Sequence, residues 1–600
     1  MCGILGQINR QAPVSREVFT AMRDSLNHRG PDSAGSEYFQ EDRVALGHLR
    51  LSIIDLSEDG RQPMTNEDGT VWLVFNGEIY NFKTLRNELE GLGHTFRSQT
   101  DSEVLIHGYE AWGLDVLQKI EGMYALALWD DNQKELILAR DRVGIKPLFY
   151  YYNGQQIYFA SELKGIVTDP QVPRKVDWES VADYLMYRFV PQPRTIYQGI
   201  RKLPPGHYLR FSFAQGDPIT APYWELKPGI DQPDNTEAIR TANSMLQASV
   251  QEQLVADVPL GVFLSGGYDS SALVMHMAST GADINSFAIG FENWGSSEHK
   301  FAKSVAETFG TSHQEWVLQD EMTGLAKELA YYYDEPLGGS SFLPTYLLSR
   351  QARKHVKVAL SGDGGDEVFA GYRWHHRLHK AYFPPKVGLM GKLRGRTNPP
   401  PPTDFAKAYH TNTSWTKWRY SDLPKAFGGG HLNAYLDKDD AWVYRRFLPN
   451  EPLSPIKSAQ LLDYHTMLPE VFLTKVDRAS MANSLEVRVP FLNTPLMEYT
   501  MQLSDEVYYK PGVTKHLLRE QLKGKVPKDI LDKPKKGFSA PKRLFLTPEH
   551  IQEVLKDGFL VKEGLLSSPY LTQLLTDWDD QKLWALYILE HWFNTWQPTE

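Results

Sequence analysis

The chain has 600 residues with a formal net charge of −10, which is long enough for more than one domain and for a large buried core. The acidic balance, with no basic tail, argues against nucleic acid as a partner, and no apolar run approaches the roughly 20 residues that cross a membrane. A single cysteine excludes an intramolecular disulfide and a cysteine-based zinc site, and with no signal-peptide pattern we expect a cytoplasmic protein that acts on small molecules.

The only cysteine, Cys2, directly follows the initiator methionine. Cysteine is small enough for that methionine to be removed, which would leave a free α-amine beside the thiol. An α-amine with a pKa of about 7.7–8.0 can take the proton of a thiol with a pKa of about 8.5, and the thiolate is then a nucleophile. A cysteine at this position without any role is the alternative, and the residue alone does not decide between the two.

The next segments are predicted to be strands that end in polar turns, at residues 3–6, 47–55 and 72–81, with a separate turn at residues 28–32. The strand at 72–81 contains Asn76-Gly77, the commonest signal of a hairpin turn. Structure alone could therefore explain the pair, which we expect at a turn. In the functional interpretation, the Asn76 amide and the Gly77 N–H are two donors for a tetrahedral oxyanion.

Five motifs, in order, resemble the class II glutamine amidotransferase domain: Met1-Cys2-Gly3-Ile4, Arg29-Gly30-Pro31-Asp32, Arg50-Leu51-Ser52, Asn76-Gly77-Glu78-Ile79-Tyr80-Asn81 and Thr100-Asp101-Ser102-Glu103. The resemblance implies an N-terminal-nucleophile fold, an α+β sandwich of antiparallel sheets that strands at residues 124–129 and 135–141 complete. It also implies that Cys2 attacks the glutamine amide, with Asn76 and Gly77 as the oxyanion hole. Arg50 would pair with the substrate α-carboxylate, and Glu78 and Asp101 would hold the α-amine.

A proline-rich stretch from residue 169 to 233 is predicted to be a packed connection, because a flexible tether would contain more glycine and serine. We place the domain boundary near residue 210. This gives a glutaminase domain at residues 1–210 and a second domain at residues 211–600. Within the second domain, residues 373–463 are expected to form a helical and loop insertion.

Residues 262–271 pass from an apolar, strand-forming run through a polar loop into a helix-forming run. The loop residues of interest are Ser265, Gly266, Gly267, Asp269, Ser270 and Ser271. Paired glycines let N–H groups turn inward, and the helix N-terminus adds roughly half a positive elementary charge, so a phosphate is well received. The serine hydroxyls can add donors, and Asp269 is explained if it holds a divalent cation. A turn capped by serines is the simpler alternative.

Helical and strand patterns alternate after residue 235, which predicts a parallel sheet with helices on both faces. A later strand, Lys357-Val358-Ala359-Leu360, ends in Ser361-Gly362-Asp363-Gly364-Gly365-Asp366-Glu367. Ligands bind at the carboxyl ends of parallel strands, so the two glycine-rich loops should lie at one edge of the sheet. Asp366 would then be a second carboxylate that faces the metal.

No GxxxxGK[ST] motif occurs, which argues against a Walker-type site. The Ser-Gly-Gly-x-Asp-Ser pattern resembles the loop of ATP pyrophosphatases, which cleave ATP between the α- and β-phosphates. Joined to a class II glutaminase, this α/β ATP pyrophosphatase domain resembles the glutamine-hydrolysing asparagine synthetase family. Stretches that agree include residues 334–336, 473–478, 485–492, 515–519 and 533–538. The resemblance implies glutamine, ATP and aspartate as substrates, Mg²⁺ as cofactor, and asparagine, glutamate, AMP and pyrophosphate as products.

The resemblance also implies the synthetase site. ATP and pyrophosphate would contact Ser265, Gly266, Gly267, Asp269, Ser270, Ser271, Ser361, Gly362 and Lys475, and the metal would contact Asp269 and Asp366. Lys475 and Lys535 would neutralise charge as pyrophosphate leaves, although lysines are more often solvated surface residues. Asp363 stands where several family members have a glutamate that is proposed to take a proton from the attacking ammonia.

Two residues depart from the family pattern: Tyr268, where an aliphatic residue is common, and Asn493, where aspartate is usual. Tyr268 could simply pack and Asn493 could cap a helix, or either could reflect a different acceptor. The same chemistry on another carboxylate, such as a sugar uronate or a peptide, therefore stays open, as does a non-catalytic scaffold of the same fold. A homodimer is compatible with the sequence, which does not fix the oligomeric state.

Overall fold

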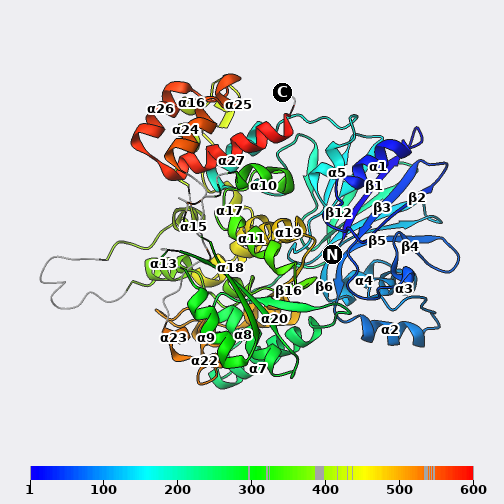
Figure 1. Ribbon diagram of the computed structural model, residues 1–600, viewed down its shortest axis with the longest axis horizontal. Coiled ribbons are helices and arrows are strands. Elements are labelled where there is room, and N and C mark those ends of the chain that lie inside the picture. The colour runs from blue at the N-terminus through cyan, green and yellow to red at the C-terminus, as the bar shows by residue number, and fades with distance from the viewer. Residues whose placement is uncertain are drawn as a thin grey trace, which may run out of the picture.

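The computed structural model describes residues 2–598 except 293, 295–296, 319–321, 323, 385–397, 415, 429, 436, 533–537, 539–540, 542–543 and 545–546. Two units lie side by side in Figure 1. The N-terminal unit, in blue and cyan, is rich in strands. The C-terminal unit, in green to red, combines a sheet with many helices.

Two six-stranded antiparallel sheets form the N-terminal unit, in the orders β10-β8-β9-β1-β3-β2 and β12-β11-β7-β6-β5-β4. The strands are β1 (Gly3–Asn9), β2 (Ser33–Phe39), β3 (Val44–Arg50), β4 (Met64–Thr65), β5 (Val71–Ile79), β6 (Gly122–Asp130), β7 (Glu135–Arg140), β8 (Phe149–Tyr152), β9 (Gln156–Ala160), β10 (Ile200–Lys202), β11 (His207–Ser212) and β12 (Ile219–Pro222). Side chains of both sheets, among them Ile4, Leu46, Val74 and Ala125, share one fully buried core. The predicted sandwich of antiparallel sheets is confirmed.

Helices cover the outer faces of this sandwich. They are α1 (Arg16–Asp24), α2 (Phe82–Gly91), α3 (Glu103–Trp112), α4 (Val116–Lys119), α5 (Leu163–Val167) and α6 (Trp178–Tyr187). Helices α1 and α5 contact the first sheet, and α3 contacts β5 of the second. Both faces of each central strand are therefore covered, which explains why every residue of β1 and β3 is buried.

The Asn76-Gly77 pair does not form the turn that we predicted. Both residues lie inside β5, where Asn76 pairs with Ala125 and Gly77 with Tyr124 of β6. A Cβ atom on Gly77 would lie 2.0 Å from the carbonyl oxygen of Met123, so glycine is needed for close approach of the two strands. The sequence signal reflected this packing constraint instead of a hairpin.

Residue 210 lies inside β11, which pairs with β7 on one side and β12 on the other. Because both strands belong to the second sheet, we propose that the N-terminal unit extends through Pro222 and that the boundary follows it. The next element, α7 (Asn235–Glu252), contacts elements of the C-terminal unit.

The C-terminal unit is built on a parallel sheet of order β15-β14-β13-β16-β17. Its strands are β13 (Leu260–Phe263), β14 (Asn285–Phe291), β15 (Ser312–Leu318), β16 (Val358–Leu360) and β17 (Glu486–Arg488). Phe263 and Phe287 belong to one core and their neighbours Val262 and Ala288 to another. Since successive residues of a strand point to opposite faces, both faces of the sheet are covered. The predicted parallel sheet is confirmed.

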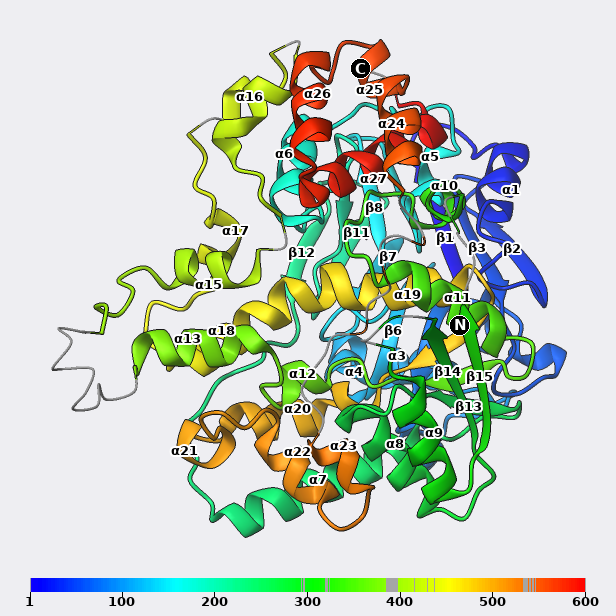
Figure 2. The same ribbon diagram turned by 60° about the vertical axis from the view of Figure 1, so that its left-hand side comes forward.

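Helices on the two faces come from distant parts of the chain. They are α7, α8 (Tyr268–Ala278) and α9 (His299–Phe309) on one side, and α11 (Phe342–Ala352) and α19 (Thr474–Met481) on the other. In Figure 2, α13 (Arg373–Tyr382), α15 (Phe405–Thr413) and α18 (Pro455–His465) lie together beside this body. They fall within the stretch that we expected to be a helical insertion.

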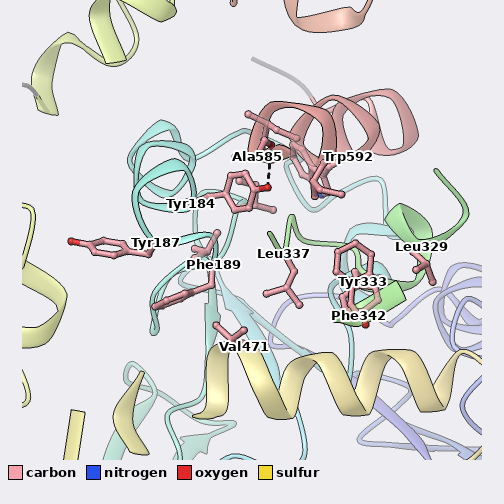
Figure 3. Packing of buried hydrophobic residues seen from close by; sticks show 14 of the residues in the cluster. Tyr184, Tyr187, Phe189, Leu329, Tyr333, Leu337, Phe342, Val471, Ala585 and Trp592 are labelled. Atoms are coloured by element: carbon pink, nitrogen blue, oxygen red, sulfur yellow. Dashed lines mark hydrogen bonds between the residues drawn. The ribbon is translucent and has the colours of Figure 1, made fainter. Parts of the chain in front are cut away.

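The last helices end with α27 (Asp580–Trp596), which packs on the N-terminal unit. The others are α20 (Thr494–Gln502), α21 (Asp505–Tyr508), α22 (His516–Leu522), α23 (Lys528–Asp532), α24 (Pro548–Lys556), α25 (Phe559–Lys562) and α26 (Ser568–Asp577). Figure 3 shows the junction of α27 with α6, where the Tyr184 hydroxyl donates to Ala585 O at 3.1 Å. Trp592 Nε1 donates to Asp334 O at 3.0 Å. The aromatic C-terminal helix is thus part of the core.

A buried ion network joins the two units around Arg29, whose side chain is inaccessible to solvent. Its Nη1 lies 2.7 Å from Glu162 Oε1 and 2.8 Å from Asp477 Oδ2 on α19. Its Nε donates to the carbonyl oxygen of Cys2 at 3.0 Å. Arg478 extends the network, with Nη1 at 2.9 Å from Glu162 Oε1.

Replacing Arg29 by methionine should cost about 3–5 kcal/mol of the free energy of unfolding, because Glu162 and Asp477 would remain buried with one cation fewer. Urea unfolding measures the loss. Arg16→Met is the control, since the Arg16 side chain is 64% exposed in its pair with Asp42, and it should change the stability little. Equal losses in both variants would contradict the importance of burial.

Candidate active sites

Cys2 begins the first candidate site. The register of β1 and β3 pairs Gly3 with Leu49, which brings Cys2 opposite Arg50. The backbone N–H of Cys2 donates to Asn76 Oδ1 at 2.9 Å. The Nδ2 atom of the same amide is buried and has no hydrogen-bond partner within the described residues, so it is a donor available to a ligand.

Burial raises the pKa of the Cys2 thiol above its usual value. A thiol in this environment needs a nearby base to become a nucleophile. The α-amine that we expect as this base depends on removal of Met1, which lies outside the described residues.

The guanidinium of Arg50 is held by backbone carbonyls. Its Nη1 donates to Ser57 O at 2.8 Å, and its Nη2 donates to Asp55 O. Gly60 makes room for it, since a Cβ atom there would lie 2.1 Å from Nη2. Carbonyl oxygens orient the guanidinium without cancelling its charge, which suits a residue that binds a carboxylate.

Glu78 follows Asn76 by two positions in β5, and Asp101 contacts the end of the same strand. Asp101 Oδ2 accepts the backbone N–H of Ile79 at 2.6 Å. Burial raises the pKa of Asp101 to about 6, against the effect of this hydrogen bond. Burial, followed by the charge of Glu486, also raises the pKa of Glu78 well above its usual value. Both carboxyl groups are therefore poised to gain from a bound cationic amine.

Sequence analysis assigned no role to Glu486 and Arg488, which reach this site from β17 of the C-terminal unit. Arg488 Nη2 lies 3.2 Å from Glu78 Oε1, and its Nε lies 2.6 Å from Glu486 Oε1. Both residues are fully buried. Their pattern in the sequence is two opposite charges at alternate positions of an apolar strand. Because charged residues are rarely buried unless they are paired, this pattern could have identified them.

The second candidate site lies where β13 and β16 end. The parallel register pairs Val262 with Leu360, so the loops that follow are neighbours at one edge of the sheet. Gly266 has φ +66°, and a Cβ atom there would lie 2.5 Å from the backbone of Phe301. Gly267 is the N-cap of α8, with no side-chain cap. The serines therefore do not cap the helix through their side chains.

A cavity of about 1030 Å³ opens beside both loops. The predicted site residues that line it are Ser265, Gly267, Asp269, Ser270, Ser361, Gly362, Asp363, Asp366 and Lys475. The Ser271 hydroxyl is buried without a hydrogen-bond partner within the described residues. Arg373, Arg377 and Lys417 line the same cavity.

Lys515 stands between the two predicted metal-binding carboxylates, a position that sequence analysis missed. Its Nζ lies 2.5 Å from Asp269 Oδ1 and 2.9 Å from Asp366 Oδ1. A Cβ atom on Gly365 would lie 2.5 Å from Asp269 Oδ1, and one on Gly371 would lie 2.0 Å from Asp366 Oδ1. Two carboxylates therefore converge on one cation, at a place where only glycine leaves enough room for them. This arrangement fits Mg²⁺, which is coordinated by oxygen atoms.

Lys475 and Asp363 form an ion pair on the wall of the cavity, with Nζ 3.0 Å from Oδ1. The Ser361 hydroxyl donates to Asp363 Oδ2. Lys475 is only 7% exposed, so it is no ordinary surface lysine. Lys535, predicted beside it, lies outside the described residues.

The two departures from the family pattern have structural partners. The Tyr268 hydroxyl donates to Leu531 O at 2.8 Å, which ties α8 to α23. Asn493 is the N-cap of α20 and accepts the N–H of Leu496. The capping interpretation of Asn493 is confirmed.

A smaller cavity of about 30 Å³ lies between the two units. Residues on both sides line it, including Pro147 and Val190 from the N-terminal unit and Leu337 and Thr474 from the C-terminal unit. Polar groups also border it: Lys202 Nζ lies 2.8 Å from Glu335 Oε2 and 2.7 Å from Glu470 Oε2. The lining of this cavity is therefore partly apolar and partly polar.

Among the described residues, the structure contains no helix with the length and hydropathy needed to cross a bilayer. This agrees with the absence of a long apolar run in the sequence.

Comparison with known proteins covers nearly the whole chain. Residues 1–224 match the glutamine amidotransferase domain family and residues 241–594 the asparagine synthase family. Asparagine synthetase [glutamine-hydrolyzing] 1 of Bacillus subtilis is 34% identical over 99% of this chain and 96% of its own, and asparagine synthetase [glutamine-hydrolyzing] 3 of that organism is 31% identical over 96% and 93%. The solved glutamine phosphoribosylpyrophosphate amidotransferase of B. subtilis is 16% identical, with a TM-score of 0.29 over 62% of this chain and 77% of its own.

Both family matches and the full-length relatives agree with the two sites described above. The chain belongs to the glutamine-hydrolysing asparagine synthetase family and is an ATP-dependent, glutamine-hydrolysing ligase.

Proposed function

We propose that the protein is a glutamine-dependent asparagine synthetase. Cys2 releases ammonia from glutamine, and the C-terminal unit uses ATP to adenylate the side-chain carboxylate of aspartate. Ammonia then displaces AMP to give asparagine, with glutamate and pyrophosphate as the other products. The observation that carries the proposal is the buried link from Cys2 O through Arg29 to Asp477, which lies on the same helix as Lys475 of the ATP site.

In the glutaminase half, the Cys2 thiolate attacks the amide carbon of glutamine and ammonia leaves, so that a thioester forms. The free Asn76 Nδ2 donor, with Gly77, receives the negative oxygen of the tetrahedral intermediate. Arg50 binds the α-carboxylate, and Asp101 with Glu78 binds the α-ammonium. Water then hydrolyses the thioester to glutamate.

In the synthetase half, an aspartate oxygen attacks the α-phosphorus of ATP and pyrophosphate leaves. The N–H groups at the start of α8 and the Lys475 ammonium receive the developing charge. Asp269 and Asp366 would hold Mg²⁺, which supplies positive charge against the triphosphate when bound. Asp363 takes a proton from ammonia as it attacks the acyl carbon.

Ammonia must cross between the two sites inside the protein, since in neutral water it is mostly protonated and lacks its lone pair. The cavity of about 30 Å³ between the units supports such a route, because it exceeds the roughly 10–15 Å³ that one water-sized molecule needs. Its mixed lining offers hydrogen bonds to the passing molecule through Lys202 and Glu470.

One observation favours a second candidate, the same chemistry on a larger carboxylate such as a sugar uronate or a peptide. The cavity of about 1030 Å³ lies at the upper end of the roughly 300–1,000 Å³ of small-molecule sites, and its α13 wall presents Arg373 and Arg377. If AMP forms with such an acid and glutamine but not with aspartate, this candidate replaces asparagine synthesis.

The protein incubated with glutamine, MgATP and aspartate should yield asparagine, AMP and pyrophosphate in equal amounts. Cys2→Ala should abolish this reaction with glutamine and leave it intact with ammonium chloride, because only the nitrogen source is lost. Chromatography of amino acids and nucleotides measures both. Loss of the ammonia-dependent reaction in Cys2→Ala would contradict the proposal that glutamine hydrolysis and amide synthesis take place at two separate sites.

Asp269→Asn should reduce pyrophosphate release by about 10–100-fold, since the loss of a charged partner in this partly buried cluster costs about 1.5–3 kcal/mol. Glutaminase activity without ATP should stay near the wild-type value. Asp283→Asn, an exposed change in the same unit, serves as the control and should affect neither activity. Parallel loss of glutaminase activity would show that Asp269 acts on the fold and not on the ATP site.

Glutaminase activity should fall as the pH drops below about 6. The pKa of Asp101 is raised to about 6, so the carboxylate that binds the α-ammonium becomes protonated in that range. The effect should appear as a higher KM for glutamine with little change in kcat. Asp101→Asn should raise KM by about 10–100-fold, the worth of a charged hydrogen bond, and should remove the inflection near pH 6. An unchanged inflection in this variant would assign it to another group.

A further inference from the structure

A cluster of potential metal ligands lies apart from both active sites. His94 follows α2, and His107 and Glu110 lie on α3. One ligand atom from each side chain falls within 4.8 Å of the others. His107 is buried, whereas His94 and Glu110 are 23% and 24% exposed, so a metal ion could reach the cluster from solvent.

The distances between these atoms suit a tetrahedral ion. Glu110 Oε2 lies 2.9 Å from His107 Nδ1 and 3.5 Å from His94 Nδ1. Ligands bound to zinc at about 2.0–2.2 Å with tetrahedral angles are separated by roughly 3.3–3.6 Å. The imidazole rings of His94 and His107 are tilted by 42°, with centroids 5.1 Å apart, so they are not stacked on each other. A small shift of the Glu110 carboxylate away from the buried His107 would bring the shorter distance into this range.

Each ligand on α3 also has a partner that fixes its orientation. His107 Nε2 lies 3.7 Å from Glu103 Oε1, which leaves Nδ1 as the atom directed at Glu110. Glu110 Oε1 accepts from Asn66 Nδ2 at 2.8 Å. Asn66 is itself fixed, because its Oδ1 accepts the backbone N–H groups of Thr70 and Val71. Metal-binding imidazoles and carboxylates are commonly held in this way.

We propose that His94, His107 and Glu110 bind a divalent transition metal, for which Zn²⁺ is the best match to two imidazoles and one carboxylate. Water would complete the coordination. The ion would fix the segment after α2 to α3, whose first residue, Glu103, follows Asp101 of the glutamine site by two positions. Its role would be to stabilise the helix that positions this carboxylate.

The test uses the untagged full-length protein, made metal-free, in the Cys2→Ala background that removes the only thiol. Co²⁺ is titrated as a spectroscopic probe and Zn²⁺ by calorimetry. We expect one ion per chain, with the intense visible bands of four-coordinate Co²⁺, and a higher thermal midpoint with Zn²⁺. Asn66→Ala should weaken binding by about 10–100-fold, the usual cost of losing a partner that orients a ligand.

His94→Gln and Glu110→Gln should abolish stoichiometric binding and the visible bands. The matched control is His550→Gln, since the His550 side chain has the same 23% exposure and also lies near a glutamate. Glu110→His should restore binding, because it supplies a third imidazole. Circular dichroism checks that each variant is folded.

Two results would overturn the proposal. Unchanged binding in His94→Gln and Glu110→Gln would place the metal elsewhere. If the folded protein with all three residues intact binds no stoichiometric metal, the cluster is an ion pair. In that case a protonated His107 lies between Glu103 and Glu110 and no metal takes part.

Discussion

The buried guanidinium of Arg29 fixes the relation between the two units. A charge removed from water is tolerated only where several acceptors surround it, and Arg29 finds them in both units: Cys2 O and Glu162 on one side, Asp477 on the other. Bidentate contact with Asp477 allows little rotation or sliding. The nucleophile's own carbonyl and the helix that carries Lys475 are thereby held in one frame. A rearrangement of either unit would leave a buried charge without its partner.

Charges that cross the interface recur at the glutamine site. Arg488 from β17 lies against Glu78, and Glu486 adds a carboxylate whose field contributes to the raised pKa values of Glu78 and Asp101. The affinity of these groups for a cationic amine therefore depends on the position of the C-terminal unit. If Glu78 and Asp101 bind glutamine as proposed, glutamine binding and the position of the C-terminal unit share one electrostatic network, which would be a physical basis for coupling the two reactions.

The parts of the site that follow from local geometry could be predicted from the sequence. Strand, glycine-rich loop and helix come in order, and parallel strands end at one edge, so the meeting of residues 265–271 with 361–366 was foreseeable. The contacts of Lys515, Glu486 and Arg488 could not be predicted in this way, because these residues reach their partners from distant positions in the chain. The misplaced Asn76-Gly77 turn has a different cause. Glycine is favoured both in hairpin turns and where two strands pack closely. The sequence of the strand alone does not tell these two cases apart, because the difference lies in the neighbouring strand.

The ion pair between Lys475 and Asp363 links the proposed steps in time. While the two are paired, with Ser361 also bonded to Asp363, both oxygens of the carboxylate are engaged within the protein. Phosphate oxygens carry more negative charge than one carboxylate, so bound ATP competes for the Lys475 ammonium. In the proposed reaction, Lys475 would turn toward the leaving pyrophosphate, which would release an Asp363 oxygen to accept a proton from the attacking ammonia. A shorter aspartate in place of glutamate fits this sequence of events, since it reaches about 1.5 Å less far and must act close to the loop that holds it.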